Sequence, residues 1–101
     1  MIKILIKRED NKFVSLEVKG HANSAEKGKD LVCAAVSGVL TGGFNALNEP
    51  KSFEIKLDKG YAFLKKINEL SSHDENVIET IIIQLKTIEE TNCKFIKIEN
   101  L

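Results

Sequence analysis

The chain has 101 residues, 43% of them hydrophobic and 30% charged, a size and balance typical of one globular domain spanning residues 1–101. Fifteen basic and fifteen acidic residues give a formal net charge of +0, which provides no overall attraction to nucleic acid or to an anionic membrane. The apolar runs are far too short to span a bilayer, which argues against a membrane-spanning helix.

The start of the chain and its cysteines indicate the compartment. The opening "MIKILIKRED" alternates apolar residues with lysines and lacks an apolar region that ends in a cleavage site, so no secretory signal is expected. We therefore expect a cytoplasmic protein whose cysteines are reduced. Cys33 and Cys93 form no CxxC motif, which argues against a zinc site or a thioredoxin-like motif.

The first two predicted elements are strands that form a hairpin. Residues 2–7 and 13–19 each show a two-residue period, and turn-forming residues lie between them at 9–12. One face of each strand is apolar, formed by Ile2, Ile4 and Ile6 in the first and by Val14, Leu16 and Val18 in the second.

A loop and a helix follow this hairpin. Residues 20–29 contain two glycines and mostly small or charged side chains, which indicates a loop, and residues 30–47 have helical spacing. The apolar stripe of this helix consists of Val32, Ala35, Val36, Val39, Leu40, Gly43, Phe44 and Leu47. Few positions suit full exposure, so we expect the sheet, the second helix or a partner subunit to cover most sides. The Gly42–Gly43 pair predicts either a bend or the close approach of another backbone.

The second half of the chain repeats the pattern of two strands and a helix. Pro50 interrupts the chain, and the strands 53–57 and 61–65 are joined by a tight turn at 58–60. A second helix is predicted over about 74–91. Its cap is expected to be Ser72 or Asp74. The apolar stripe of this helix consists of Val77, Ile78, Ile81, Ile82, Leu85 and Ile88.

A last strand over 93–99 closes the chain. The order ββαββαβ predicts an α+β domain, with a mostly antiparallel sheet packed against two helices. Cys93, at the start of the last strand, is expected to be structural. His73, in the turn before the second helix, is expected to be exposed.

His21 and Cys33 could form a catalytic pair. If Asp30 is the N-cap, Cys33 lies in the first helical turn, where unpaired N–H groups and the helix dipole favour an anion. The thiolate is the reactive form of cysteine. His21 ends the second strand and could reach back across the loop as a base for the thiol. The same N–H groups could hold the oxyanion of an acyl-transfer intermediate.

Each of these residues also has a structural interpretation. A cysteine in an apolar helix is often a small buried hydrophobe. His21 suits a turn, and Asp30 needs no role beyond capping. Ser37 lies one turn after Cys33 on the same face, where its hydroxyl can bond back to a helix carbonyl.

Three short motifs give this region a specific signature. The string "GHA" at 20–22 is followed by a glycine at 28 and by "DLVCAAVS" at 30–37. This combination closely resembles the signature of the bacterial ribosomal-processing cysteine proteases. The order of the predicted elements is similar to theirs over the whole chain.

The resemblance implies a function and a set of site residues. Cys33 would be the nucleophile and His21 the general base, with Gly20, Asp30 and Ser37 supporting the site. Whether Asp30 also orients His21 stays open. The family fold is a compact homodimer, and no metal or cofactor is involved. Members remove the N-terminal extension of protein twenty-seven of the large ribosomal subunit, so this extension is the expected substrate.

The loop 22–29 is expected to be a lid. It has little to pack against, so substrate would order it and thereby complete the site. Replacement of Gly28 by proline should then impair peptide cleavage far more than it lowers the melting temperature.

Two other classes of function are consistent with the residues. One is a non-enzymatic ribosome-associated or RNA-binding module, although no run interleaves surface aromatics with Arg or Lys, so direct nucleic-acid binding is not expected. The other is a thiol redox sensor built on Cys33. Such a sensor usually needs a resolving cysteine, and Cys93 is the one candidate within the chain.

Overall fold

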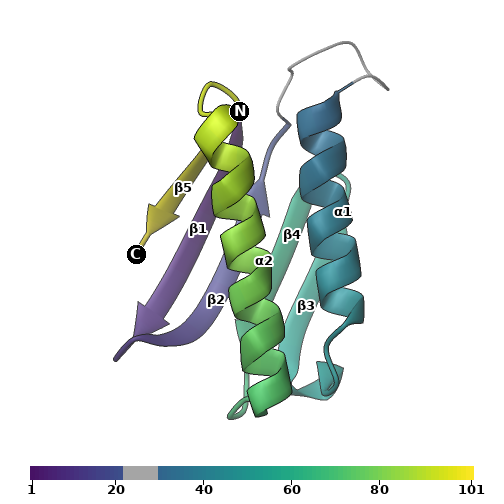
Figure 1. Ribbon diagram of the computed structural model, residues 1–101. Coiled ribbons are helices and arrows are strands. Elements are labelled where there is room, and N and C mark those ends of the chain that lie inside the picture. The colour runs from purple at the N-terminus through teal and green to yellow at the C-terminus, as the bar shows by residue number, and fades with distance from the viewer. Residues whose placement is uncertain (22–29) are drawn as a thin grey trace.

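Two helices lie side by side on one face of a five-stranded sheet in the computed structural model, which describes residues 1–21 and 30–101 (Figure 1). The elements, in chain order, are β1 (Ile2–Glu9), β2 (Lys12–Lys19), α1 (Leu31–Asn45), the short 3-10 helix η1 (Pro50–Ser52), β3 (Phe53–Asp58), β4 (Tyr61–Lys66), α2 (Ser72–Thr91) and β5 (Ile96–Asn100). This order confirms the predicted ββαββαβ arrangement and the α+β class. The predicted lid at 22–29 lies outside the described residues.

The strands are arranged in the order β3-β4-β2-β1-β5. Neighbours pair antiparallel except β1 and β5, which are parallel, so the sheet is mostly antiparallel as predicted. Because β4 pairs with β2, the turn between β3 and β4 lies beside the end of β2. This pairing could not be predicted from the sequence pattern. It brings two segments that are distant in the chain together at the candidate site.

The core fills the space between the sheet and the two helices. Ile2, Ile4 and Ile6 are buried, as their alternation predicts. The prediction for Val14 is wrong. Lys7 pairs with Ser15 but Arg8 pairs with Phe13, so a bulge removes Val14 from the alternation and Phe13 takes the core position.

Helix α1 begins as predicted. The Asp30 side chain accepts a hydrogen bond from the Cys33 N–H at 3.0 Å, which confirms Asp30 as the N-cap. The buried face consists of Val32, Val36, Leu40 and Phe44, and Leu47 is buried just beyond the helix.

The opposite face of α1 differs from the prediction. Ala35, predicted within the stripe, is exposed, and the rest of this face consists of small exposed residues. The described part of the chain therefore covers one side of the helix only. At Gly43 the expected close approach is present, because an added Cβ would lie 2.5 Å from the Ile81 side chain of α2. The approaching group is a side chain and not a backbone.

Helix α2 is capped by Ser71, so the prediction of Ser72 or Asp74 is wrong. The Ser71 hydroxyl accepts a hydrogen bond from the Asp74 N–H at 3.1 Å. The Asp74 carboxylate is buried and accepts hydrogen bonds from the N–H groups of Asn48 at 2.8 Å and Glu49 at 3.1 Å. Asp74 thus holds the segment after α1 against the start of α2.

The remaining polar predictions are only partly confirmed. His73 is exposed, as predicted, and its Nε2 lies 2.9 Å from the carbonyl oxygen of Ala46. The last strand begins at Ile96 and not at residue 93, so Cys93 lies in an exposed turn and is not a strand residue. No helix among the described residues is long and apolar enough to cross a membrane.

Candidate active site

His21 follows a sharp change of chain direction at the end of β2. Gly20 has φ +99, a conformation that glycine adopts without strain. A Cβ at this position would lie 2.5 Å from the Met1 carbonyl oxygen, so glycine is also required for space. The Gly20 N–H donates to the carbonyl oxygen of Gly60 at 3.0 Å. This bond fixes the residue before His21 to the turn between β3 and β4.

Cys33 is the third residue of α1 and is partly exposed. The Asp30 cap binds its backbone N–H, which fixes the helix start and with it the direction of the Cys33 side chain. The positive end of the helix dipole lies at this turn, where it favours negative charge.

One cavity of about 190 Å³ brings these parts together. Four of the five predicted site residues line it, namely Gly20, His21, Cys33 and Ser37. Asp30 is not among the lining residues and acts on the site through its bond to Cys33. The rest of the wall comes from the core and from the β3–β4 hairpin.

The hairpin residues of the cavity were missed by sequence reasoning. Leu57, Asp58, Gly60 and Tyr61 line the cavity opposite α1. The sequence identified 58–60 as a tight turn but contained no signal for its place beside His21, because strand order does not follow from alternation.

Tyr61 is hydrogen-bonded and is not available as a second base. Its hydroxyl donates to Glu17 Oε2 at 2.7 Å. This bond raises the pKa of Tyr61 above its ordinary value and lowers the pKa of Glu17. The tyrosine therefore stays a neutral phenol near neutral pH.

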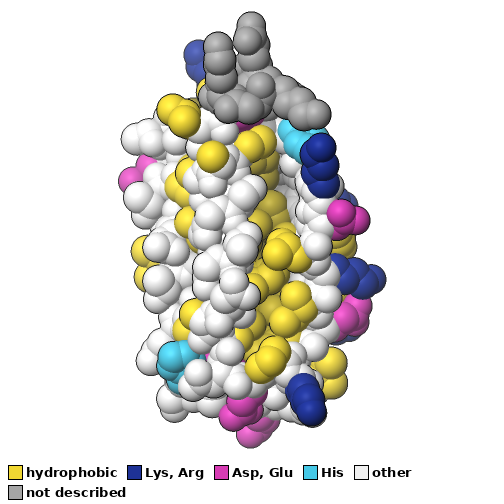
Figure 2. Space-filling view, turned by 90° about the vertical axis from the view of Figure 1, so that its right-hand side faces the viewer, with side chains coloured by type: hydrophobic (Ala, Val, Ile, Leu, Met, Phe, Trp, Pro, Cys, Tyr) yellow, Lys and Arg dark blue, Asp and Glu magenta, His cyan; other side chains and the backbone are white. Residues whose placement is uncertain are grey.

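An apolar furrow runs beside α1. Figure 2 shows hydrophobic side chains gathered along the side of α1 that faces the β3 edge of the sheet. Leu57 and Ile55 of β3 are 51% and 37% exposed. Leu57 also lines the cavity that holds His21 and Cys33, so apolar surface continues outward from it.

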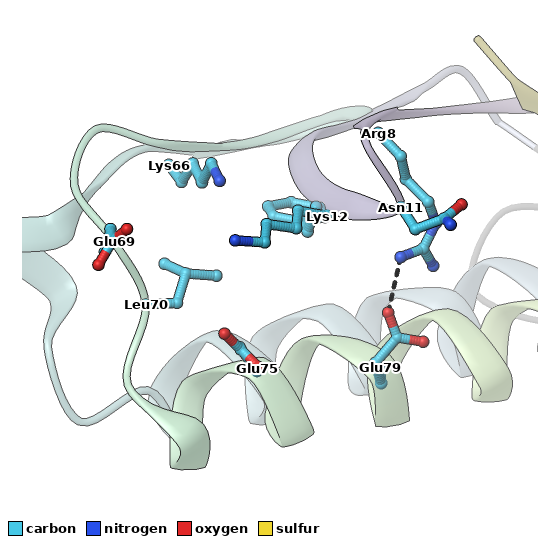
Figure 3. Close-up of a pocket in the computed structure, with 9 residues that line it drawn as sticks. Arg8, Asn11, Lys12, Lys66, Glu69, Leu70, Glu75 and Glu79 are labelled. Carbon is cyan, nitrogen blue, oxygen red and sulfur yellow. Dashed lines mark hydrogen bonds and ion pairs between the residues drawn. The ribbon is translucent and has the colours of Figure 1, made fainter.

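A second cavity of about 260 Å³ has a different chemical character (Figure 3). It is lined by Arg8, Asn11, Lys12, Phe13, Lys66, Glu69, Leu70, Glu75 and Glu79. Arg8 Nη1 and Glu79 Oε1 form an ion pair at 2.8 Å across it. The cavity contains no His or Cys and balances three cations against three carboxylates, so it offers no nucleophile.

The described residues contain no group of three or more His, Cys, Asp or Glu side chains placed to hold a metal ion.

Comparisons with known proteins agree on one family. The sequence profile described as cysteine protease Prp matches residues 1–97. The ribosomal processing cysteine protease Prp of Bacillus subtilis is 39% identical over 98 residues, covering 88% of each chain. The protein of the same name from Mycoplasma genitalium is 39% identical over 89 residues, covering 87% of this chain and 84% of that one.

Two crystal structures of the S. aureus ribosomal processing protease Prp match over the full length of both chains. The structure in complex with a covalently linked product peptide has a TM-score of 0.91 at 29% identity. The structure in complex with a substrate peptide has a TM-score of 0.84 at 27% identity.

Proposed function

Because this chain belongs to the Prp family of cysteine proteases, we propose that Cys33 is its nucleophile and His21 its general base. The observation that carries this assignment is their presence in one cavity, with Cys33 in the first turn of α1. Family membership decides against the non-enzymatic module and the redox sensor as the main function. The chain is a cysteine protease.

The two side chains have complementary roles in peptide hydrolysis. His21 takes the thiol proton, the sulfur attacks the carbonyl carbon of the scissile bond, and the carbonyl oxygen becomes an oxyanion. Collapse of this intermediate breaks the C–N bond, and His21 returns the proton to the leaving amine. His21 then deprotonates a water molecule that attacks the acyl-enzyme, which releases the acid and restores the thiol.

The helix start would also stabilise the oxyanion. The Cys33 N–H is bonded to Asp30, so the donors that this turn can offer are the N–H groups of Leu31 and Val32. Asp30 and Gly20 hold the backbones that carry the thiol and the imidazole, and Ser37 adds a hydroxyl to the wall.

We propose the N-terminal extension of large-subunit ribosomal protein twenty-seven as the substrate. The relatives named above are called ribosomal processing proteases, and the S. aureus protein has been crystallised with a substrate peptide. The open side of the cavity and its apolar continuation along β3 suit an extended peptide. In this proposal the enzyme acts in the cytoplasm, needs no metal or cofactor, and binds no nucleic acid directly.

We further propose that the chain acts as a homodimer. The outward face of α1 supports this, because it consists of Ala34, Ala35, Gly38 and Gly42, all exposed. A Cβ at Gly38 would meet nothing within 4 Å, so Gly38→Arg should leave the monomer folded and shift sedimentation from dimer to monomer. Gln84→Arg, at an exposed position on α2, should leave the dimer intact.

The decisive experiment is a cleavage assay read by intact mass. The purified protein is mixed with the precursor of the twenty-seventh large-subunit protein from the same genome, and Cys33→Ala and His21→Ala are run in parallel. The chain has two cysteines and two histidines, so Cys93→Ala and His73→Ala are matched controls. We expect one cut by the parent and by both controls, and none by either site variant. A cut that survives Cys33→Ala would refute the assignment.

A further inference from the structure

We propose that Gly60 is a positioning residue for the reaction, because the absence of a side chain there creates the place that the His21 imidazole occupies. This inference rests on the proposed role of His21 as general base. It concerns a residue on a different hairpin, which reaches His21 through the pairing of β4 with β2.

The contact between Gly60 and the imidazole is very close. A Cβ built at Gly60 would lie 2.8 Å from His21 Nε2 and 3.1 Å from Cε1, well inside ordinary van der Waals contact. The obstructing atoms belong to a side chain and not to the backbone. A larger residue at this position would therefore leave the hairpin in place and push the ring away from its position in the cavity.

The backbone cannot easily relieve this crowding. The Gly20 N–H donates to the Gly60 carbonyl at 3.0 Å, and Lys19 pairs with Tyr61 in the sheet, so the turn and the residue before His21 are fixed to each other. The Met1 carbonyl oxygen also packs closely against Gly20, since it lies 2.5 Å from where a Cβ of Gly20 would be. Of the parts in contact, the ring is the one that is free to rotate.

Displacement of the ring would affect proton transfer directly. Nε2 is one of the two imidazole nitrogens that can exchange a proton, and it is the ring atom nearest to the built Cβ. A shift of about 1 Å in a catalytic group can cost about a hundredfold in rate. Gly60 thus sets the catalytic geometry through the position of the His21 ring.

The positive φ of Gly60 is a separate requirement that a control can isolate. Gly60 has φ +74, and Asn11 in the β1–β2 turn has φ +63 with an ordinary side chain. Positive φ alone does not demand glycine, because asparagine tolerates this region. Gly60→Asn therefore adds the Cβ at an accepted φ. Asn11→Ala introduces φ strain in a turn that lines the other cavity.

The test combines kinetics with NMR of the two histidines. In Gly60→Asn and Gly60→Ala we expect kcat to fall by about tenfold to a hundredfold, with a shifted pH–rate profile. The His21 ring signals should move while those of His73 stay unchanged. Asn11→Ala should lower the melting temperature and leave kcat and the His21 signals as in the parent.

The outcomes separate this inference from the proposed function. An active His21→Ala enzyme would refute the role of His21 itself. An inactive His21→Ala enzyme together with Gly60 variants that keep parental kcat or parental His21 signals would overturn the present inference alone. If Gly60→Asn fails to fold, the double variant Gly60→Asn with His21→Ala should recover stability, because the obstructing ring is gone. A double variant that stays unfolded would also overturn the inference about Gly60.

Discussion

The starts of the two helices have the same local geometry, but their third residues lie in different surroundings. In α1 the Asp30 side chain accepts a hydrogen bond from the N–H of Cys33, and in α2 the Ser71 side chain does the same for Asp74. Both caps are short polar residues in extended backbone, and both bind the third residue of the helix. The backbone arrangement at residues 30–33 and 71–74 is thus nearly interchangeable.

The difference lies in what surrounds the third residue. Cys33 lines a cavity that it shares with His21 and remains partly exposed. Asp74 has no exposed surface, and its carboxylate accepts two backbone N–H groups from residues 48 and 49. A capped helix start therefore fixes the position of the third helical residue but does not determine the role of that residue. In our proposal the neighbouring strands make Cys33 a nucleophile, whereas the contact with residues 48 and 49 makes Asp74 a structural anchor.

The largest expected effect is on activity at the first helix start. Cys33→Ala should lower kcat by about ten-thousandfold or more, because the nucleophile is lost. The melting temperature should fall only slightly, since Cys33 packs against the core but is only partly buried, and alanine removes just its sulfur atom. Cleavage kinetics and thermal denaturation on the same sample check both. Substantial destabilisation would mean that Cys33 is a core residue, which would remove the contrast between the two helix starts.

The largest effect on stability is expected at the second helix start. Asp74→Ala removes the buried carboxylate that accepts hydrogen bonds from the N–H groups of Asn48 and Glu49, which should lower the free energy of unfolding by about 2–3 kcal/mol. Denaturant titration measures this change. Below the melting temperature kcat should remain near that of the parent, because Asp74 does not line the catalytic cavity. A selective loss of kcat at unchanged stability would contradict the division of roles.

Variants that remove one cap each form a matched pair, which should separate an effect on stability from an effect on activity. Asp30→Ala and Ser71→Ala each remove one cap bond and should each lower the free energy of unfolding by about 1 kcal/mol. Asp30→Ala should in addition lower kcat by about tenfold, because the turn that carries Cys33 loses its anchor. Equal kcat in the two variants would show that the cap does not position the thiol.

Much of this comparison could be predicted from the sequence, because it depends on local patterns. The helical spacing and the string "DLVC" predicted Asp30 as a cap and Cys33 in the first turn, and both are confirmed. At the second helix the string "SSHD" offers several capping residues. The choice of Ser71 follows from the burial of Asp74 against residues 48 and 49, a long-range contact that no local pattern contains.

The parts of the site that could not be predicted also depend on contacts between segments that are distant in the chain. The sequence predicted the turn at 58–60, but its place beside His21 depends on the pairing of β4 with β2. Val14 likewise fits an alternating strand, and only the bulge opposite Lys7 and Arg8 removes it from the core. The family signature marked His21 and Cys33 directly. Gly60 lies outside the motifs at 20–22 and 30–37, and its proposed role depends on its contact with the ring.

The smallest expected effect comes from Asp30→Asn, and it tests what the carboxylate does beyond capping. Asparagine is as good a cap as aspartate, so the free energy of unfolding should change by less than about 0.5 kcal/mol. If Asp30 acts only as a cap, kcat should stay within about threefold of the parent, since the amide oxygen can hold the same Cys33 N–H. Alkylation of Cys33 should then also keep the parental rate, with Cys93 as an internal reference. A loss of kcat as large as in Asp30→Ala would instead mean that the charge itself is used, which would make Asp30 a third member of the catalytic group.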